Sequence, residues 1–198
     1  MSFAIFILPN QEFYNDIMSW KKLVEINLKN QPYNSHPPHL TVLNIDIKNI
    51  EEALKRSLNT VNSFKSFELE IKKTDVFWDD FKTDGGHTLY YKVKRNKSLY
   101  KLQRLLAESL ISLNFKKNIL KNVKNKEMSI SNKKYGSPFI GNHWIPHFSI
   151  SSLKTKKDYF IIKEFLKSKN NYRCHVNEVS FWEINNENHH FIKQASLK

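Results

Sequence analysis

The sequence predicts an α+β fold made of two copies of one strand–helix–strand–helix–strand unit, related by an approximate twofold axis. Three observations support this prediction. The hydrophobic period alternates between strand-like and helix-like values along the chain. The same order of elements occurs twice. The same short motif occupies the third element of each copy. At 198 residues we expect one bilobal domain, with the two copies at about 1–83 and 84–198.

The first copy begins with an apolar strand at 3–8. A helix is predicted at about 11–28, because its apolar side chains recur at helical spacing: Phe13, Ile17, Trp20, Leu23 and Val24. The turn-rich stretch QPYNSHPP leads into a short strand at 39–45. A helix at about 50–64 then precedes the alternating strand FELEIKKTDVF, which ends the first copy.

The second copy begins with a strand at 87–93, after the turn signal Asp84-Gly85-Gly86. Ser98 can cap a helix whose apolar stripe includes Leu102, Leu105, Leu106 and Leu110. A strand at 145–153, a helix at about 157–167 and a strand at 175–184 complete the repeat. A last strand is expected at about 190–195.

The two copies differ by one insertion. From Phe3 to His39 is 36 positions, and from the matching Thr88 to His147 is 59, an excess of 23. Residues 116–138 have that length and contain seven Lys against one Glu, so we predict an inserted surface loop or short hairpin there. Such a segment is either a solvated, compositionally biased loop or a basic flap beside the site.

The composition is typical of a soluble protein with an anionic partner. The formal net charge is +13, which would attract phosphates, although the excess of Lys, Asn and Ile could also reflect an AT-rich coding sequence. No apolar stretch approaches the roughly 20 residues of a membrane span, and the first residues do not resemble a signal peptide. Cys174 is the single cysteine, which excludes an internal disulfide and predicts a reducing, cytoplasmic setting.

The residues that carry chemistry lie at the same point of each copy. PPHLTVLNI contains His39 and Thr41, and IPHFSISSL contains His147 and Ser149. Residues i and i+2 of a strand project from the same face, so each segment presents one imidazole and one hydroxyl together. Under twofold symmetry the two pairs face each other across one groove, while Leu40, Val42, Phe148 and Ile150 turn toward the core.

This arrangement suits hydrolysis of a phosphodiester. One neutral imidazole can take a proton from water while the other, protonated, donates a proton to the departing ribose oxygen. The hydroxyls of Thr41 and Ser149 can donate to the phosphate oxygens. Neither a metal nor another cofactor is required. About one His-x-Ser/Thr is expected by chance, but both copies follow a proline and both lie in apolar strands.

On these paired motifs and the repeated order, the chain resembles the two-histidine (2H) phosphoesterase superfamily, the LigT-like or 2'-5' RNA ligase-like proteins. The resemblance implies two antiparallel sheets lining a central cleft. It also implies metal-independent cleavage of 2',3'-cyclic phosphates or 2'-5' linkages in RNA or small nucleotides, with His39 and His147 catalytic and Thr41 and Ser149 binding phosphate. Two features depart from the family pattern: Ser149 replaces the commoner Thr, and the motifs lie unusually far apart.

Other residues offer weaker candidates. His36 and His143 lie on the approach loops, where they could contact a phosphate or a base, and Trp144 could stack on a base at the rim. His189 and His190 lack the companions that a metal site needs. We interpret Trp20, Trp78 and Trp182 as packing residues and Asp75, Asp79, Asp80 and Asp84 as parts of a polar turn.

Two classes of function fit these observations. The first is a phosphodiesterase, whose substrates could include cyclic or 2'-5'-linked oligonucleotide signals, and which could in principle run in reverse as a ligase. The second is a nucleotide- or RNA-binding module that uses the same cleft without turnover. Intact proton-transfer pairs favour the enzyme, because a binding module does not need them. No helix shows a sustained heptad seam, so the sequence predicts no oligomeric state.

Overall fold

The strands of the protein form one eight-stranded antiparallel sheet in the computed structural model, which describes residues 2–114, 126–185 and 188–198. The strands lie side by side in the order β6-β3-β4-β5-β2-β1-β7-β8. Their bounds are β1 (Ser2–Ile7), β2 (Leu40–Asp46), β3 (Phe67–Asp80), β4 (Gly86–Val93), β5 (His147–Leu153), β6 (Tyr172–Val176), β7 (Glu178–Asn185) and β8 (Asn188–Ser196).

The sheet consists of two half-sheets that are joined where strand β2 pairs with strand β5. The first half-sheet is β6, β3, β4 and β5, and the second is β2, β1, β7 and β8. Leu40 of β2 pairs with Phe148 of β5 at the junction. The predicted α+β fold with antiparallel strands is therefore confirmed, but the two expected sheets are joined into one.

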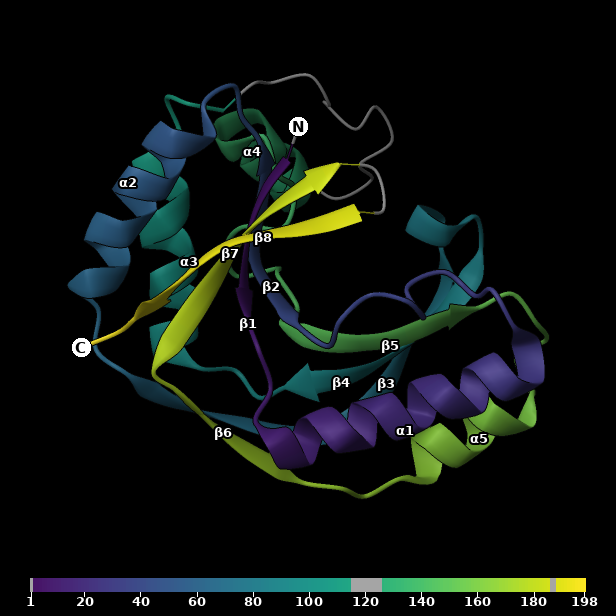
Figure 1. Ribbon diagram of the computed structural model, residues 1–198. Helices are drawn as coiled ribbons and strands as arrows, with labels where there is room; N and C mark the ends of the chain where they lie inside the picture. Colours follow the sequence, from purple (N-terminus) through teal and green to yellow (C-terminus); the bar gives the residue numbers. More distant parts are fainter. Residues whose placement is uncertain (1, 115–125, 186–187) are drawn as a thin grey trace.

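Helices cover the outside of the curved sheet (Figure 1). Helices α1 (Gln11–Leu28) and α5 (Phe160–Lys167) contact β5 and β3 of the first half-sheet. Helices α2 (Ile50–Asn62) and α3 (Lys97–Leu110) contact each other and strands of the second half-sheet. The inner face of the sheet, which these four helices leave uncovered, carries the two His-x-hydroxyl motifs.

Each half-sheet combines strands from both sequence copies. Strand β3, from the first copy, pairs with β4 and β6 from the second, whereas β7, from the second copy, pairs with β1 from the first. The boundary between residues 83 and 84 therefore separates two sequence copies and not the two halves of the sheet.

Three local predictions were wrong. The strand expected at 175–184 is interrupted at Asn177, because β6 pairs with β3 whereas β7 pairs with β1 in the other half-sheet. Helix α3 is capped by Asn96, whose side chain accepts a hydrogen bond from the Leu99 amide at 2.9 Å, and not by Ser98. Within the predicted loop or hairpin at 116–138, Lys126–Tyr135 form helix α4, and residues 116–125 lie outside the described residues.

The hydrophobic core anchors the two strands that carry the motifs. Leu40, Val42, Phe148 and Ile150 are at most 1% exposed, as their alternation with the motif residues predicts. Full burial of such a side chain stabilises the fold by about 1.5–3 kcal/mol. Phe13 of α1 packs edge-on against Phe148, with ring centroids 5.0 Å apart, so the first helix directly supports the strand of the second motif.

Candidate active site

Both motifs line one cavity of about 990 Å³. Its walls come from β2, from the end of β3 with the 3₁₀-helix η1 (Phe81–Thr83), from β5 and from the segment at 136–147 that follows α4. Ligand pockets usually have about 300–1,000 Å³, so this cavity lies at the upper end of that range.

The two histidines are held in the same way. Nδ1 of His39 lies 2.7 Å from the Pro37 carbonyl oxygen, and Nδ1 of His147 lies 2.7 Å from the Ile145 carbonyl oxygen. A carbonyl can only accept, so each Nδ1 carries a proton and donates it. In the neutral ring this leaves the Nε2 lone pair available as a base.

The ring environments of the two histidines differ. The His39 ring stacks on Phe6, with centroids 3.9 Å apart and planes 22° apart. The His147 ring instead meets Phe77 and Tyr90 edge-on, with centroids 5.0 and 5.2 Å apart. These aromatic contacts restrict both rings to one orientation.

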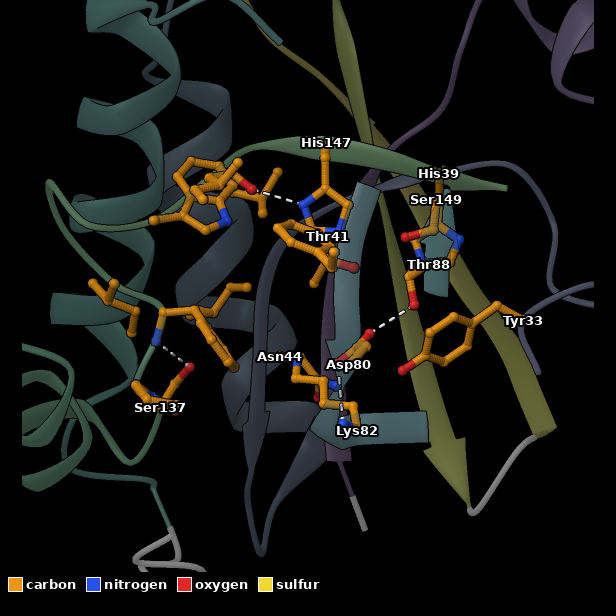
Figure 2. A pocket seen from close by; sticks show the side chains of 18 of the residues that line it. Tyr33, His39, Thr41, Asn44, Asp80, Lys82, Thr88, Ser137, His147 and Ser149 are labelled. Carbon is orange, nitrogen blue, oxygen red and sulfur yellow. Dashed lines mark hydrogen bonds between the residues drawn. The ribbon is translucent and has the colours of Figure 1, made fainter. Parts of the chain in front are cut away.

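The register at the sheet junction brings each imidazole beside the hydroxyl of the other motif. Leu40 pairs with Phe148 in antiparallel register, so one residue to either side His39 lies opposite Ser149 and Thr41 lies opposite His147. Side chains in such positions have Cβ atoms about 4.5–5.5 Å apart. Figure 2 shows both pairs together at one end of the cavity. A single phosphate group can therefore contact both motifs.

The hydroxyls of Thr41 and Ser149 are available for a ligand. Both side chains are half-buried and line the cavity. Within the described part of the chain, neither hydroxyl makes a side-chain hydrogen bond. They are thus free to donate to phosphate oxygens, as the sequence predicts.

Burial lowers the pKa of both histidines. The pKa of His39 falls to about 3, since burial outweighs the Pro37 carbonyl, which favours the protonated ring. Burial lowers the pKa of His147 to about 4, where Lys82 adds to the effect and Asp80 opposes it. Both imidazoles are consequently neutral at pH 7 in the free protein, and a bound anion would raise both pKa values.

A buried lysine connects the approach loop of His39 to the strand of the second motif. Lys21 of α1 is 3% exposed, and its Nζ donates to the carbonyl oxygens of Tyr33 at 2.6 Å, Asn34 at 3.2 Å and Ile150 at 2.6 Å. Burial lowers the pKa of Lys21 to about 8. This role could not be predicted from the sequence, because Lys21 looks like any other charged residue of an amphipathic helix.

Gln103 of α3 supports the site from the other side. Its Nε2 donates to the carbonyl oxygens of Val42 at 3.1 Å and Phe139 at 2.9 Å, and its Oε1 accepts from the Gly141 amide at 3.2 Å. The buried amide thus joins the strand of the first motif to the segment that leads into the second.

The acidic stretch that we interpreted as a polar turn supplies part of the cavity wall. The Asp80 carboxylate accepts from the Thr88 hydroxyl at 2.7 Å and the Lys82 amide at 3.0 Å, and the Lys82 ammonium lies 4.0 Å from the centroid of the Phe139 ring. Asp80 and Lys82 lie across the cavity from the histidines (Figure 2). The turn itself needs glycine, because Gly85 has φ +85°. Lys82 was not among the residues that the sequence singled out.

The aromatic rim differs from the expected one. Trp144 lines the cavity but is 6% exposed, and it packs edge-on against Tyr100. The more accessible aromatic residues at the cavity are Trp78, 43% exposed, and Phe81, 67% exposed, so the interpretation of Trp78 as a packing residue was wrong. His143 lines the cavity with its Nε2 2.6 Å from the Pro138 carbonyl oxygen.

Within the described residues, no group of three or more His, Cys, Asp or Glu side chains is arranged to hold a metal ion. In the same part of the chain, no helix is long and apolar enough to cross a membrane.

A duplicated α+β fold with two His-x-hydroxyl strands side by side at one cavity defines the class of two-histidine phosphoesterases. The chain belongs to the 2'-5' RNA ligase superfamily, whose family model matches residues 9–188. The resemblance predicted from the paired motifs is thereby confirmed.

Solved structures show the same fold at low sequence identity. TT0787 of Thermus thermophilus superposes with a TM-score of 0.64 at 14% identity, covering 100% of this chain and 98% of that one. E. coli LigT complexed with 3'-AMP gives a TM-score of 0.60 at 12% identity, covering 98% of this chain and 96% of that one. E. coli LigT complexed with NADP+ gives a TM-score of 0.59 at 12% identity, covering 99% of this chain and 96% of that one. A search of curated proteins finds no match.

Proposed function

We propose that the chain is a metal-independent phosphodiesterase that hydrolyses 2',3'-cyclic phosphate or 2'-5' linkages of RNA or small oligonucleotides. The observation that carries this proposal is the crossed arrangement of the motifs: His39 lies opposite Ser149, and Thr41 lies opposite His147, on the wall of one cavity. Each imidazole is oriented by a backbone carbonyl at 2.7 Å.

The reaction needs only these side chains and water. Nε2 of one neutral histidine takes a proton from water as the water oxygen bonds to phosphorus. The bond between phosphorus and the leaving ribose oxygen breaks, and that oxygen receives the proton of the other, protonated histidine. Thr41 and Ser149 donate to the non-bridging oxygens, which carry the charge in the transition state. The pair ends with its protons exchanged, and solvent restores the starting state.

Three further observations favour a nucleotide substrate. The chain has a formal net charge of +13, which attracts polyanions. Trp78 and Phe81 offer exposed rings at the cavity on which a base can stack, a contact worth about 1–3 kcal/mol per base. E. coli LigT, which shares the fold, has been crystallised with 3'-AMP.

The first test is hydrolysis of a 2',3'-cyclic nucleotide and a 2'-5'-linked dinucleotide in excess EDTA. We expect turnover by the wild type and a fall of roughly 10²–10⁴ in rate for His39→Ala and for His147→Ala, because each removes a proton-transfer group. The matched control is His190→Ala, since His190 is exposed and does not line the cavity.

Activity that survives both catalytic substitutions would refute the mechanism. A wild type that binds both compounds without turnover would instead indicate a nucleotide-binding module. Rates that fall in EDTA and recover on addition of a metal ion would contradict the metal-independent part of the proposal.

A further inference from the structure

Two further imidazoles lie beside His39 in the cavity. His36, from the loop between α1 and β2, and His189, from β8, have ring centroids 4.5 Å apart. The His189 ring lies 5.8 Å from the His39 ring. All three side chains line the cavity and are half-buried, so three segments distant in sequence bring these rings together.

This group, which we call the histidine cluster (His36, His39 and His189), lies near the buried ammonium of Lys21. Burial lowers the pKa of His36, and His189 and Lys21 lower it further. Burial also lowers the pKa of His39, and His189, His36 and Lys21 add to this effect. Each of these neighbours is positively charged when protonated. Burial lowers the pKa of His36 to about 4, so its ring is neutral at pH 7.

The charged groups near His147 are different. There Lys82 lowers the pKa of His147 and Asp80 raises it, so the two charges oppose each other. This electrostatic difference adds to the different ring contacts of His39 and His147. An anionic group of the substrate next to the one that is cleaved would therefore be accommodated better beside His39 than beside His147.

We propose that His36 and His189 bind a second phosphate group of the substrate, beside the phosphate held by His39 and His147. This inference rests on the proposed function and narrows its substrate class to nucleotides or oligonucleotides with two neighbouring phosphates. The bound phosphate stabilises protonated imidazoles, so binding takes up protons. The second phosphate is either a terminal 5'-phosphate or the next phosphodiester of an RNA strand, and both present anionic non-bridging oxygens.

The test compares three substrates in EDTA: a nucleoside 2',3'-cyclic phosphate, the same compound with a 5'-phosphate, and a dinucleotide that ends in a 2',3'-cyclic phosphate. We expect kcat/KM of the wild type to be at least tenfold higher for one of the two compounds that carry a second phosphate, which identifies its source. In the His36→Asn/His189→Asn double variant the ratio falls to about 1.

The matched control is His190→Asn, next to His189 but exposed and outside the cavity, which should keep the wild-type ratio. Calorimetry with a nucleoside 3',5'-bisphosphate in two buffers of different ionisation heat adds a readout independent of turnover. The wild type should take up more protons than the double variant, and the two single variants serve if the double variant does not fold.

Equal kcat/KM of the wild type for all three compounds overturns the second-phosphate site while leaving the phosphodiesterase proposal intact. A preference that persists in the double variant has the same meaning. A preference that requires added metal ion overturns it in favour of a metal site. Absence of any turnover by the wild type refutes the proposed function itself.

Discussion

At the scale of single residues, the hydrogen bond from each motif imidazole to a carbonyl two residues earlier determines which ring nitrogen can act as a base. This bond fixes Nδ1 as the donor in both His39 and His147. The tautomer is thus set by the backbone of the motif itself and needs no carboxylate partner. The same local geometry occurs twice because a proline precedes each histidine and an extended strand follows it.

The low pKa values of the two histidines predict the pH dependence of the reaction. Catalysis needs one neutral and one protonated imidazole, whereas both are neutral at pH 7 in the free protein, with pKa values of about 3 and 4. We therefore expect kcat/KM to rise about tenfold per unit as pH falls from 7 toward 5. Because the bound phosphate raises both pKa values, kcat should have its optimum at higher pH than kcat/KM.

The measurement is a set of initial rates between pH 5 and 8 with a 2',3'-cyclic nucleotide, whose phosphodiester stays anionic throughout. A kcat/KM that is flat or rises with pH over this range would contradict the assignment of both histidines as neutral in the free state.

At the scale of elements, Lys21 joins helix α1, the loop before β2 and strand β5 through three carbonyl oxygens. Lys21→Met keeps most of the volume of the side chain but leaves these acceptors without their buried donor. We expect a loss of about 2–4 kcal/mol in the free energy of unfolding. Activity should fall as well, because the approach loop carries His36 and leads to His39.

Urea denaturation followed by circular dichroism measures this effect, with Lys22→Met as the control. Lys22 is the exposed neighbour on the same helix, and its substitution should change stability by no more than about 0.5 kcal/mol. Equal effects of the two substitutions would show that the buried ammonium does not hold these elements together.

Many of the helices and strands could be predicted from the sequence. The helix at about 11–28 was predicted with its observed bounds, because its apolar side chains recur at helical spacing; the structure adds Asn10 as its N-cap. The two His-x-hydroxyl motifs that line the cavity could be predicted because a repeated motif on apolar strands is a local pattern. The contributions of Lys21, Gln103 and Lys82 could not be predicted, since each depends on contacts between segments that only the tertiary fold brings together. The break at Asn177 likewise depends on which half-sheet each strand joins.

At the scale of the whole molecule, the neutral histidines predict how stability depends on pH. The pKa values of His36, His39 and His147 are lowered in the folded protein to about 4, 3 and 4, against a usual value of about 6.5. At pH values between the folded and the usual pKa, these histidines bind more protons in the unfolded chain than in the folded one. Stability should therefore be retained above about pH 6.5 and fall as pH decreases from there toward 4.

Comparison of thermal unfolding midpoints between pH 4.5 and 7.5 tests this expectation. The His36→Asn/His39→Asn variant should lose less stability on acidification than the wild type, because two of the groups that protonate on unfolding are gone. An identical pH dependence of variant and wild type would show that these histidines are not held neutral.

The junction of the half-sheets also bears on how such a fold diversifies. His39 and His147 lie next to the pair of Leu40 and Phe148, so one imidazole belongs to each half-sheet. A small rotation of one half-sheet against the other changes the separation of the rings without altering either motif. Substitutions in the helices that pack against the outer face of the sheet can therefore alter the width of the substrate that fits between the two imidazoles. Related proteins can in this way differ in substrate specificity while they keep the same two motifs.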